Sequence, residues 1–300
     1  MANTFIVEQT VGRTALSLLS RDLVLPRTVY RAAQAEYVGG KGETINIRKP
    51  ASLTPRTYTK ALRNAGTPIV MDDLTETTVP LVIDTIAYSA VAITDEDLTL
   101  NLVDFGVQVL DPMVKAVGIG NENALAAVMN GAGVTQTQTG TAAAPHAAIL
   151  AARTTLNKKN VPMGDRWLAV SPEVEQYLLT DAENRLIRHD SSGDSPNTAL
   201  RDAMVGRLYG FQVIVSNALT ANTAIAYHMD AFAFASVAPA VPAGAAFGQS
   251  VSDAAQGLAM RYLRDYDYAF QRDRAALSSL VGAKVLDADR VVKITLTPPA

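Results

Sequence analysis

Short glycine-rich stretches of the chain resemble catalytic loops but lack other residues that those loops need. Gly39-Gly40-Lys41-Gly42 has the glycines and lysine of a phosphate-binding loop, yet position 35 is Ala and Thr44 does not directly follow the lysine. Gly118-Ile119-Gly120 lacks the third glycine of a dinucleotide-binding turn and lies inside a helical pattern. Gly193-Asp194-Ser195-Pro196-Asn197 ends in Asn where a nucleophile elbow has Gly. None of these stretches predicts nucleotide binding or acyl transfer.

The histidines are the next candidates for chemistry, and their spacing does not support a site. His146, His189 and His228 are far apart in the sequence, and no HExxH helix occurs. A triad assembled in space from Ser195, His189 and Asp265 would make the protein an enzyme of unknown class, which we keep as a low-weight alternative. We therefore predict no catalytic residue, no metal site and no cofactor.

Two further clusters have both a functional and a structural interpretation. Asp95-Glu96-Asp97 could bind a metal, but acids in the first turn of a helix usually interact with the helix dipole. A run of aromatic and basic residues could stack on nucleic acid, although interleaved acids favour a packed strand with paired charges. These residues are Tyr262, Tyr266, Tyr268, Phe270, Arg261 and Arg264, with Asp265, Asp267 and Asp273 among them.

The composition narrows the class of protein. The absence of cysteine excludes disulfides and thiolate chemistry, and the net charge of −3 argues against a dedicated nucleic-acid-binding protein. The first residues show no basic region followed by an apolar core, so we expect no secretory signal. The uncharged run Ala231–Ser252 contains Pro239, Pro242 and Gly244, which favours a strand and an ordered loop over a membrane span. Charged residues are only 18% of the chain, below the ~25% typical of soluble domains, so we expect copies of the chain to cover much of its surface.

An extended ribbon is predicted between Gly39 and Ile93. It alternates through Glu43–Arg48, turns at Asn64-Ala65-Gly66 and returns through Thr77–Ile83. An isolated two-stranded ribbon is marginally stable in water, and its open edges invite pairing with other chains. The ribbon is therefore either an arm that completes its burial on a neighbouring subunit or a solvated surface hairpin, and the sequence favours neither alternative.

The ribbon divides into a basic half and an acidic half, which could complement each other between subunits. The basic half has one acid, Glu43, among Lys41, Arg48, Lys49, Arg56, Lys60 and Arg63. The acidic half has no basic residue among Asp72, Asp73, Glu76 and Asp84.

The strongest helical pattern follows the ribbon. Thr94 is a suitable N-cap for the acids 95–97, and an apolar stripe continues through Leu98, Leu102, Phe105 and Val109. Asp111-Pro112 predicts a kink, with Asp111 capping a second segment that Gly118 and Gly120 weaken and Asn130-Gly131 ends. We expect one kinked helix of roughly 35 residues, or two stacked in line, far longer than the usual ~11–12.

The remainder alternates between helices and short strands. We expect an amphipathic arm with a helix over Val11–Arg21 near the start, and an α/β domain from about residue 132. In that domain His146–Leu156 is a predicted helix, Trp167–Val170 a buried strand and Ser171-Pro172 the start of another helix. Further strands are predicted at Phe211–Val215, Ile225–His228, Lys284–Leu286 and Arg290–Leu296.

Seven parts of the chain are informative together through their order and spacing. They are Thr4–Val7, Gly39–Ile83, Ala87–Asp97, Trp167–Glu173, Gly206–Val213 with Ser216-Asn217, Asp230–Ala235 and Gly282–Val285. In this order they resemble the major capsid proteins of tailed bacteriophages with the HK97-type fold. Within that superfamily the chain is similar to the group related to the coat protein of the podovirus-type Salmonella phages.

The resemblance implies an α+β chain in five parts. These are an N-terminal arm (1–36), an extended β-hairpin loop with its return strand (37–93), a long spine helix beside a peripheral β-sheet (94–131), an α/β axial domain (132–265) and a C-terminal return to the peripheral domain (266–300). In this layout we expect inter-subunit contacts from Arg56, Lys60, Arg63, Asp72, Asp73 and Glu76, and a jointed spine at Asp111 and Pro112.

The same resemblance implies the function and the partners. The chain would form hexamers and pentamers of an icosahedral shell that encloses phage double-stranded DNA without sequence-specific binding. It would meet a portal protein and a decoration protein, and no membrane. Because no long N-terminal coiled coil is present, we expect a separate scaffolding protein. The location would be the virion, after assembly in the bacterial host cytoplasm and expansion of a rounded precursor. An encapsulin-like bacterial compartment is the alternative with the same fold.

Overall fold

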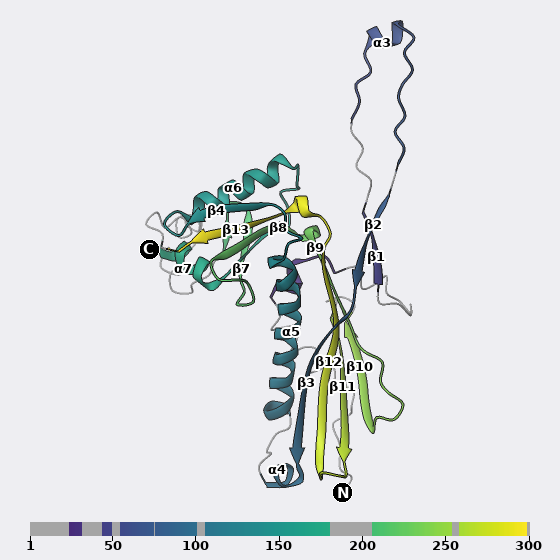
Figure 1. Ribbon diagram of the computed structural model, residues 1–300, viewed down its shortest axis with the longest axis vertical. Helices are drawn as coiled ribbons and strands as arrows, with labels where there is room; N and C mark the ends of the chain where they lie inside the picture. Colours follow the sequence, from purple (N-terminus) through teal and green to yellow (C-terminus); the bar gives the residue numbers. More distant parts are fainter. Residues whose placement is uncertain are drawn as a thin grey trace.

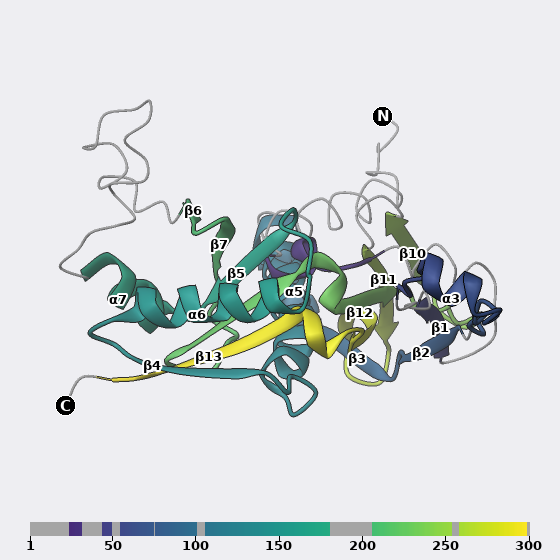
Figure 2. The same ribbon diagram turned by 90° about the horizontal axis from the view of Figure 1, so that it is seen from above.

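The computed structural model describes residues 24–31, 44–49, 55–74, 76–100, 106–180, 206–253 and 258–298. In this part of the chain a long helix runs beside one β-sheet, and a second sheet lies at the end of that helix (Figure 1). A narrow loop projects from the junction of these parts. The second sheet and the loop lie at opposite ends of the molecule when it is seen from above (Figure 2).

The sheet beside the long helix, called the long sheet below, is antiparallel throughout. Its strands follow the order β10-β11-β12-β3, and β9 pairs with the C-terminal part of β12. Strand β12 is central because it pairs with β11, β3 and β9, and its buried Ala275, Leu277 and Val281 alternate as a strand with one covered face requires. The strands are β3 (Thr85–Thr94), β9 (Phe232–Val237), β10 (Phe247–Asp253), β11 (Leu258–Asp267) and β12 (Arg272–Val285).

The long helix is α5, Asp111–Asn130, which packs against β12 and β3. Its end at Asn130 confirms the predicted stop. Gly120, which was expected only to weaken the helix, has a packing role: a Cβ added there would lie 3.0 Å from the Cβ of Ala87 in β3. The absence of a side chain lets the helix and the sheet approach closely.

The region before α5 differs from the prediction. The short helix α4 (Asp95–Leu100) begins as expected, since the Thr94 hydroxyl accepts a hydrogen bond from the Asp97 amide at 3.2 Å. The helix η2 (Gly106–Leu110) is a π-helical turn that leads directly into α5. The predicted stripe residues Leu102 and Phe105 lie outside the described residues.

The second sheet, called the six-stranded sheet, mixes parallel and antiparallel pairs. Its order is β4-β13-β8-β5-β7-β6, with β13–β4 and β5–β7 parallel. The helices α6 (Pro145–Lys158) and α7 (Pro172–Thr180) contribute buried residues to the apolar cluster on one face of it. The strands are β4 (Thr137–Thr141), β5 (Arg166–Val170), β6 (Arg207–Leu208), β7 (Phe211–Val215), β8 (Thr223–His228) and β13 (Val291–Thr297).

Most predicted elements of this region are confirmed, but the two sheets do not follow the predicted domain ranges. Strands β9, β10 and β11 lie within the predicted axial range 132–265 and yet belong to the long sheet. Strand β13, expected to return to the peripheral domain, pairs with β8 and β4 in the six-stranded sheet. The period-two pattern predicts that a segment is a strand, but its pairing partner depends on contacts that are distant in sequence.

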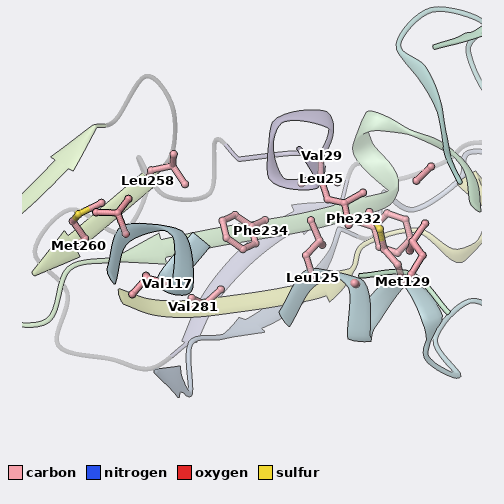
Figure 3. Packing of buried hydrophobic residues seen from close by; sticks show 14 of the residues in the cluster. Leu25, Val29, Val117, Leu125, Met129, Phe232, Phe234, Leu258, Met260 and Val281 are labelled. Atoms are coloured by element: carbon pink, nitrogen blue, oxygen red, sulfur yellow. The ribbon is translucent and has the colours of Figure 1, made fainter. Parts of the chain in front are cut away.

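The main core lies where α5 meets the long sheet, β8 and the segment before the extended loop. Figure 3 shows Leu25 and Val29 near Phe232, with Leu125 and Met129 of α5 close by. The short helix η1 (Leu25–Thr28) is held there by a 2.6 Å hydrogen bond between the Thr28 and Tyr227 hydroxyls. Burial raises the pKa of Tyr227 well above its usual range, so this phenol stays protonated. The predicted helix Val11–Arg21 lies outside the described residues.

The projecting loop, called the extended loop, consists of β1 (Thr44–Lys49), β2 (Thr77–Val82) and the residues between them. β1 and β2 pair antiparallel, with Thr44 opposite Val82 and Lys49 opposite Thr77. The short helix α3 (Lys60–Asn64) occupies its tip, and Gly66 beyond it has φ +66°, which confirms the predicted turn. The described residues on either side of the tip, 55–59 and 65–74, run well away from the rest of the described chain (Figure 1).

Candidate assembly surfaces

Only the base of the extended loop is anchored on the rest of the described chain. Ile45, Ile47, Leu81 and Ile83 are buried there against Ala233 and Ala235 of β9, in a small cluster separate from the main core. Burying an aliphatic side chain of this size stabilises by about 1.5–3 kcal/mol. The base is therefore fixed by apolar packing, whereas the tip has no such support from the described residues of its own chain.

Gly282 of β12 allows the base of the loop to lie this close. A Cβ added at Gly282 would lie 2.5 Å from the Val82 carbonyl oxygen and 3.2 Å from the Ile83 Cα. Both are backbone atoms, so a side chain here would displace the chain itself and not a flexible neighbour. Gly282 opens the segment Gly282–Val285 on which the resemblance partly rests, and this close approach is a structural reason for glycine at that position.

Ion pairs surround a cavity of about 660 Å³ at the junction of the loop with both sheets. Lys49 of β1 lies 3.3 Å from the carboxylate of Asp287, which also lies 3.3 Å from Arg290. Arg290 bonds Asp230 at 3.1 Å, and Lys159 at the end of α6 bonds Asp289 at 3.0 Å. The hydrogen bond from Lys159 lowers the pKa of Asp289. Charges thus link the extended loop, the connection between β12 and β13, and the six-stranded sheet.

The charged residues predicted at the tip fall into two groups. Arg56 and Asp72 pair within the loop, where the guanidinium donates three hydrogen bonds of 2.5–3.1 Å to the carboxylate and connects the two limbs. This bond raises the pKa of Arg56. The other four, Lys60, Arg63, Asp73 and Glu76, are exposed and form no ion pair among the described residues.

Apolar side chains at the same tip were not singled out from the sequence. Ile69, Val70, Met71 and Leu74 are all exposed, with Met71 at 91%. A run of apolar residues in a segment that has no core of its own was the available signal, because such a run is uncovered unless another molecule meets it.

The long sheet carries two more exposed apolar surfaces. On β3, Ile86 and Tyr88 are exposed, Tyr88 at 72%, although they lie within a regular strand. In the turn between β11 and β12, Tyr268 is 86% exposed and Phe270 packs under the guanidinium of Arg272 at 4.6 Å. The predicted packed aromatic strand is therefore confirmed for Tyr262, which is buried, and wrong for Tyr268 and Phe270.

The predicted charge pairing in β11 and β12 is present. Arg264 donates a 2.6 Å hydrogen bond to Asp273, a buried carboxylate, and Arg272 lies 3.3 Å from Asp267. The bond with Asp273 raises the pKa of Arg264. Tyr266 donates a 2.6 Å hydrogen bond to Asp95, which ties α4 to β11 and raises the pKa of Tyr266 to about 12. One acid of the Asp95-Glu96-Asp97 cluster is thus engaged in packing contacts.

The predicted cap at Asp111 is wrong. The residue before it, Leu110, is already helical (φ −69°, ψ −45°), and the Asp111 carboxylate pairs with Lys115 at 2.8 Å, one turn along α5. Pro112 lies in the first turn of α5, immediately after the π-helical turn. A proline offers no amide hydrogen to the preceding turn, and π turns are themselves sites of irregularity. The structure thus has a π-helical turn directly before Asp111, where the sequence predicted a cap, and the kink itself stays a prediction.

The candidate catalytic motifs do not form a site in the described residues. Gly39–Gly42, His189 and Ser195 lie outside those residues, and His146 packs edge-on against Tyr209 at 5.9 Å. No three His, Asp or Glu side chains gather as a possible metal site within the described ranges. None of the helices described there is long and apolar enough to cross a membrane.

Comparison with known proteins identifies a family and a fold. Residues 76–294 match the profile of a family described as phage capsid protein. No curated protein matches the chain significantly. Among solved structures, the chain is similar to one from Mycobacterium phage Che8 (TM-score 0.63, 23% identity, 91% of this chain and 90% of that chain covered). A second, described as the capsid structure of cyanophage P-SCSP1u, has a TM-score of 0.61 at 15% identity, with 86% of this chain and 85% of that one covered.

A virus-like particle from Pyrococcus furiosus is also similar, with a TM-score of 0.55 and 12% identity over 96% of this chain and all of the other. At these identities the similarity establishes the fold alone. It agrees with the predicted α+β capsid fold of the HK97 type, in which a long helix lies beside one sheet and a loop projects from the body.

Proposed function

This chain belongs to the phage capsid protein family, and from that premise we propose how it builds its shell. It is a major capsid protein, a structural subunit whose copies surround the phage DNA. The extended loop is the observation that carries the proposal, because its base is packed and its tip presents exposed apolar side chains and charges that form no ion pair with the described residues. In this proposal the tip of each copy covers a neighbouring copy, so the ribbon acts as an arm and not as a solvated surface hairpin.

The contact proposed is heterologous, since a projecting tip meets a different surface on its neighbour. Heterologous contacts that close by rotation form rings, here the hexamers and pentamers of an icosahedral shell. The net charge of −3 suits a container that holds double-stranded DNA without sequence-specific binding. Arg56 and Asp72 stabilise the tip from within, and Lys60, Arg63, Asp73 and Glu76 contact neighbouring copies.

The finer assignments rest on the resemblance of sequence segments. We place the chain near the coat proteins of podovirus-type Salmonella phages, with assembly in the host cytoplasm as a rounded precursor. A separate scaffolding protein, a portal protein and a decoration protein are the proposed partners.

Electron microscopy of the purified protein, with and without a co-expressed scaffolding protein, tests the proposal. Closed shells are the expected result. Small discrete oligomers under every condition would contradict it.

An encapsulin-like compartment is the weaker alternative, and the similarity to the virus-like particle from Pyrococcus furiosus is the observation that keeps it in view. Neighbouring genes separate the two: portal and terminase genes support a virion protein, and a gene for a cargo enzyme supports a compartment.

Arg63 offers the cleanest test of the loop's charges. Its side chain is exposed without an ion pair in the described part of the chain, and an exposed pair is worth only about 0–1 kcal/mol. Arg63→Glu should therefore leave the thermal melt of the unassembled chain unchanged but reduce shell yield, because a shell repeats each contact many times. Arg63→Lys keeps the charge and should assemble normally. If the Arg63→Glu chain has a lower melting temperature than the wild type yet forms shells in normal yield, the loop is an intramolecular element.

A further inference from the structure

Two short 3₁₀ helices carry the chain between the two sheets. The helix η3 (Met229–Ala231) connects β8 of the six-stranded sheet to β9 of the long sheet, and η4 (Ala288–Arg290) lies on the way from β12 of the long sheet to β13 of the six-stranded sheet. They are held together, since the Leu286 amide donates a 2.8 Å hydrogen bond to the Ala231 carbonyl oxygen. A rotation of one sheet relative to the other must change this pair of connections, called the inter-sheet hinge below.

His228 stands at the start of the hinge, and its contacts fix its protonation state. It is the last residue of β8 and is 7% exposed. Its Nδ1 accepts a 3.2 Å hydrogen bond from the Asp230 amide, which caps η3. A ring nitrogen that accepts a hydrogen bond carries no proton, whereas both nitrogens of an imidazolium are donors. The imidazole is therefore neutral in this structure, and its charged form cannot make the cap.

The carboxylate of Asp230 joins the two helices of the hinge. It lies 3.1 Å from the guanidinium of Arg290 in η4, and it also lies 3.5 Å from Nδ1 of His228. A proton on Nδ1 would attract this carboxylate away from Arg290. The same proton would remove the acceptor of the Asp230 amide, so a single protonation acts on both contacts.

Charges on the neighbouring elements act on this imidazole in both directions. Arg290 of η4 and Arg166, which lies opposite His228 in β5, disfavour its charged form, and Asp230 and Asp165 favour it. Burial is the largest influence, and it lowers the pKa of His228 below its ordinary value of 6.5. The contribution of the neutral imidazole to stability is therefore complete above about pH 6.5 and is lost as the pH falls through the lower pKa of the folded chain.

We propose that His228 is a proton-operated switch of the inter-sheet hinge. While the imidazole is neutral, it caps η3 and leaves Asp230 on Arg290, so the two sheets are held in one arrangement. When it takes up a proton, the cap is lost and Asp230 turns to the imidazolium. The link between η3 and η4 then loosens, and the six-stranded sheet moves relative to the long sheet. This is a property of the single chain and does not depend on the proposed shell function.

The chain has one tryptophan, and it lies beside the hinge. Trp167 of β5 pairs with Tyr227, the residue before His228, and it packs against the main core. Loosening of the hinge should admit water to the indole and shift its fluorescence to longer wavelength. We expect this shift, reversibly and below about pH 6.5, when the unassembled chain is titrated from about pH 8 to about pH 4.5. Far-UV circular dichroism should stay constant, because both sheets remain folded.

Three variants assign the transition. His228→Asn cannot be protonated but keeps the cap, because an asparagine side-chain oxygen is a good N-cap acceptor, so its emission should stay constant over the same range. The control His146→Asn changes a buried histidine at the start of α6, whereas the end of α6 at Lys159 is the one that meets η4; it should keep the wild-type transition. Arg290→Gln removes a cation that disfavours the charged imidazole and should move the transition to higher pH, which a purely structural role would not do.

The switch is overturned if the wild-type emission does not change over this range, or if His228→Asn shows the wild-type transition. Loss of the circular dichroism signal together with the emission shift would also overturn it, because that result is global unfolding. If a histidine variant does not fold, the Arg290→Gln chain decides: a raised midpoint supports the switch, and an unchanged midpoint contradicts it. Shell formation is not measured in these experiments, so a failure here leaves the proposed function untouched.

Discussion

Substituting Gly282 should detach the extended loop from the long sheet. The added Cβ of Gly282→Ala would lie 2.5 Å from the Val82 carbonyl oxygen, whereas ordinary contacts begin at 3.4 Å. The backbone of the loop must then move by about 0.9 Å, which is overpacking of the kind that costs about 1–3 kcal/mol. The shift is transmitted to Leu81 and Ile83, the buried residues that hold the base of the loop.

Thermal melting of the unassembled chain measures the effect. At about 2–4 °C per kcal/mol for chains of this order of size, the melting temperature should fall by about 2–12 °C. Because the displaced base redirects the tip, we also expect electron microscopy to show fewer closed shells. Both effects come from one contact, so they should appear together.

Gly164→Ala is the matched control, since a Cβ at Gly164 meets no atom within 4 Å. This variant should melt at or slightly above the wild-type temperature, because alanine restricts the unfolded chain more than glycine does. A Gly282→Ala chain that melts and assembles like the wild type would refute the reasoning. That result would mean that the loop can shift on the long sheet without loss of stability or of assembly.

Three further predictions concern the long sheet and the spine. Arg264→Leu leaves the buried Asp273 carboxylate without its partner and should lower the free energy of unfolding by about 1–3 kcal/mol. This loss is smaller than for a fully buried pair because Arg264 is partly exposed. Urea denaturation measures the loss, and an unchanged denaturation midpoint would contradict the prediction. The pKa of Tyr262 is raised to about 12 by burial, against about 10 in the unfolded chain, so its contribution to stability is complete below pH 10 and is lost as pH rises toward 12. Between pH 9 and 12 the melting temperature of Tyr262→Phe should therefore fall less steeply than that of the wild type. If the two curves of melting temperature against pH are parallel, ionisation of this phenol is not a source of the loss of stability. Pro112→Ala restores an amide donor after the π-helical turn, so we expect a more regular start of α5. If the turn bends during maturation, particles of this variant should stay in either the precursor or the mature form, and electron microscopy counts the two forms. Normal conversion from precursor to mature particles would mean that the turn has only a packing role.

The sequence alone determined which segments form strands and helices and where several of them end. Alternation predicted β1, β2 and β13, the Thr94 cap predicted the start of α4, and Gly66 predicted the turn near the tip of the loop. These features depend on neighbouring residues, through side-chain period, cap chemistry and backbone conformation, so they can be predicted locally. The order of segments was sufficient to suggest the capsid fold, and the family match agrees with it.

Only the tertiary structure decided which strands share a sheet and which side chains remain bare. The pairing of β13 with β8 and of β9 with β12 joins residues far apart in sequence, and the pattern of a strand carries no information about its partner. The same holds for Arg56 with Asp72, which pair within one loop, and for Ile69–Met71, whose side chains are left exposed by the described part of the chain. The close approach at Gly282 and the π-helical turn before α5 follow from how packed elements meet. Exposure and close contact are properties of the assembled chain, because they depend on every element that does or does not cover a residue.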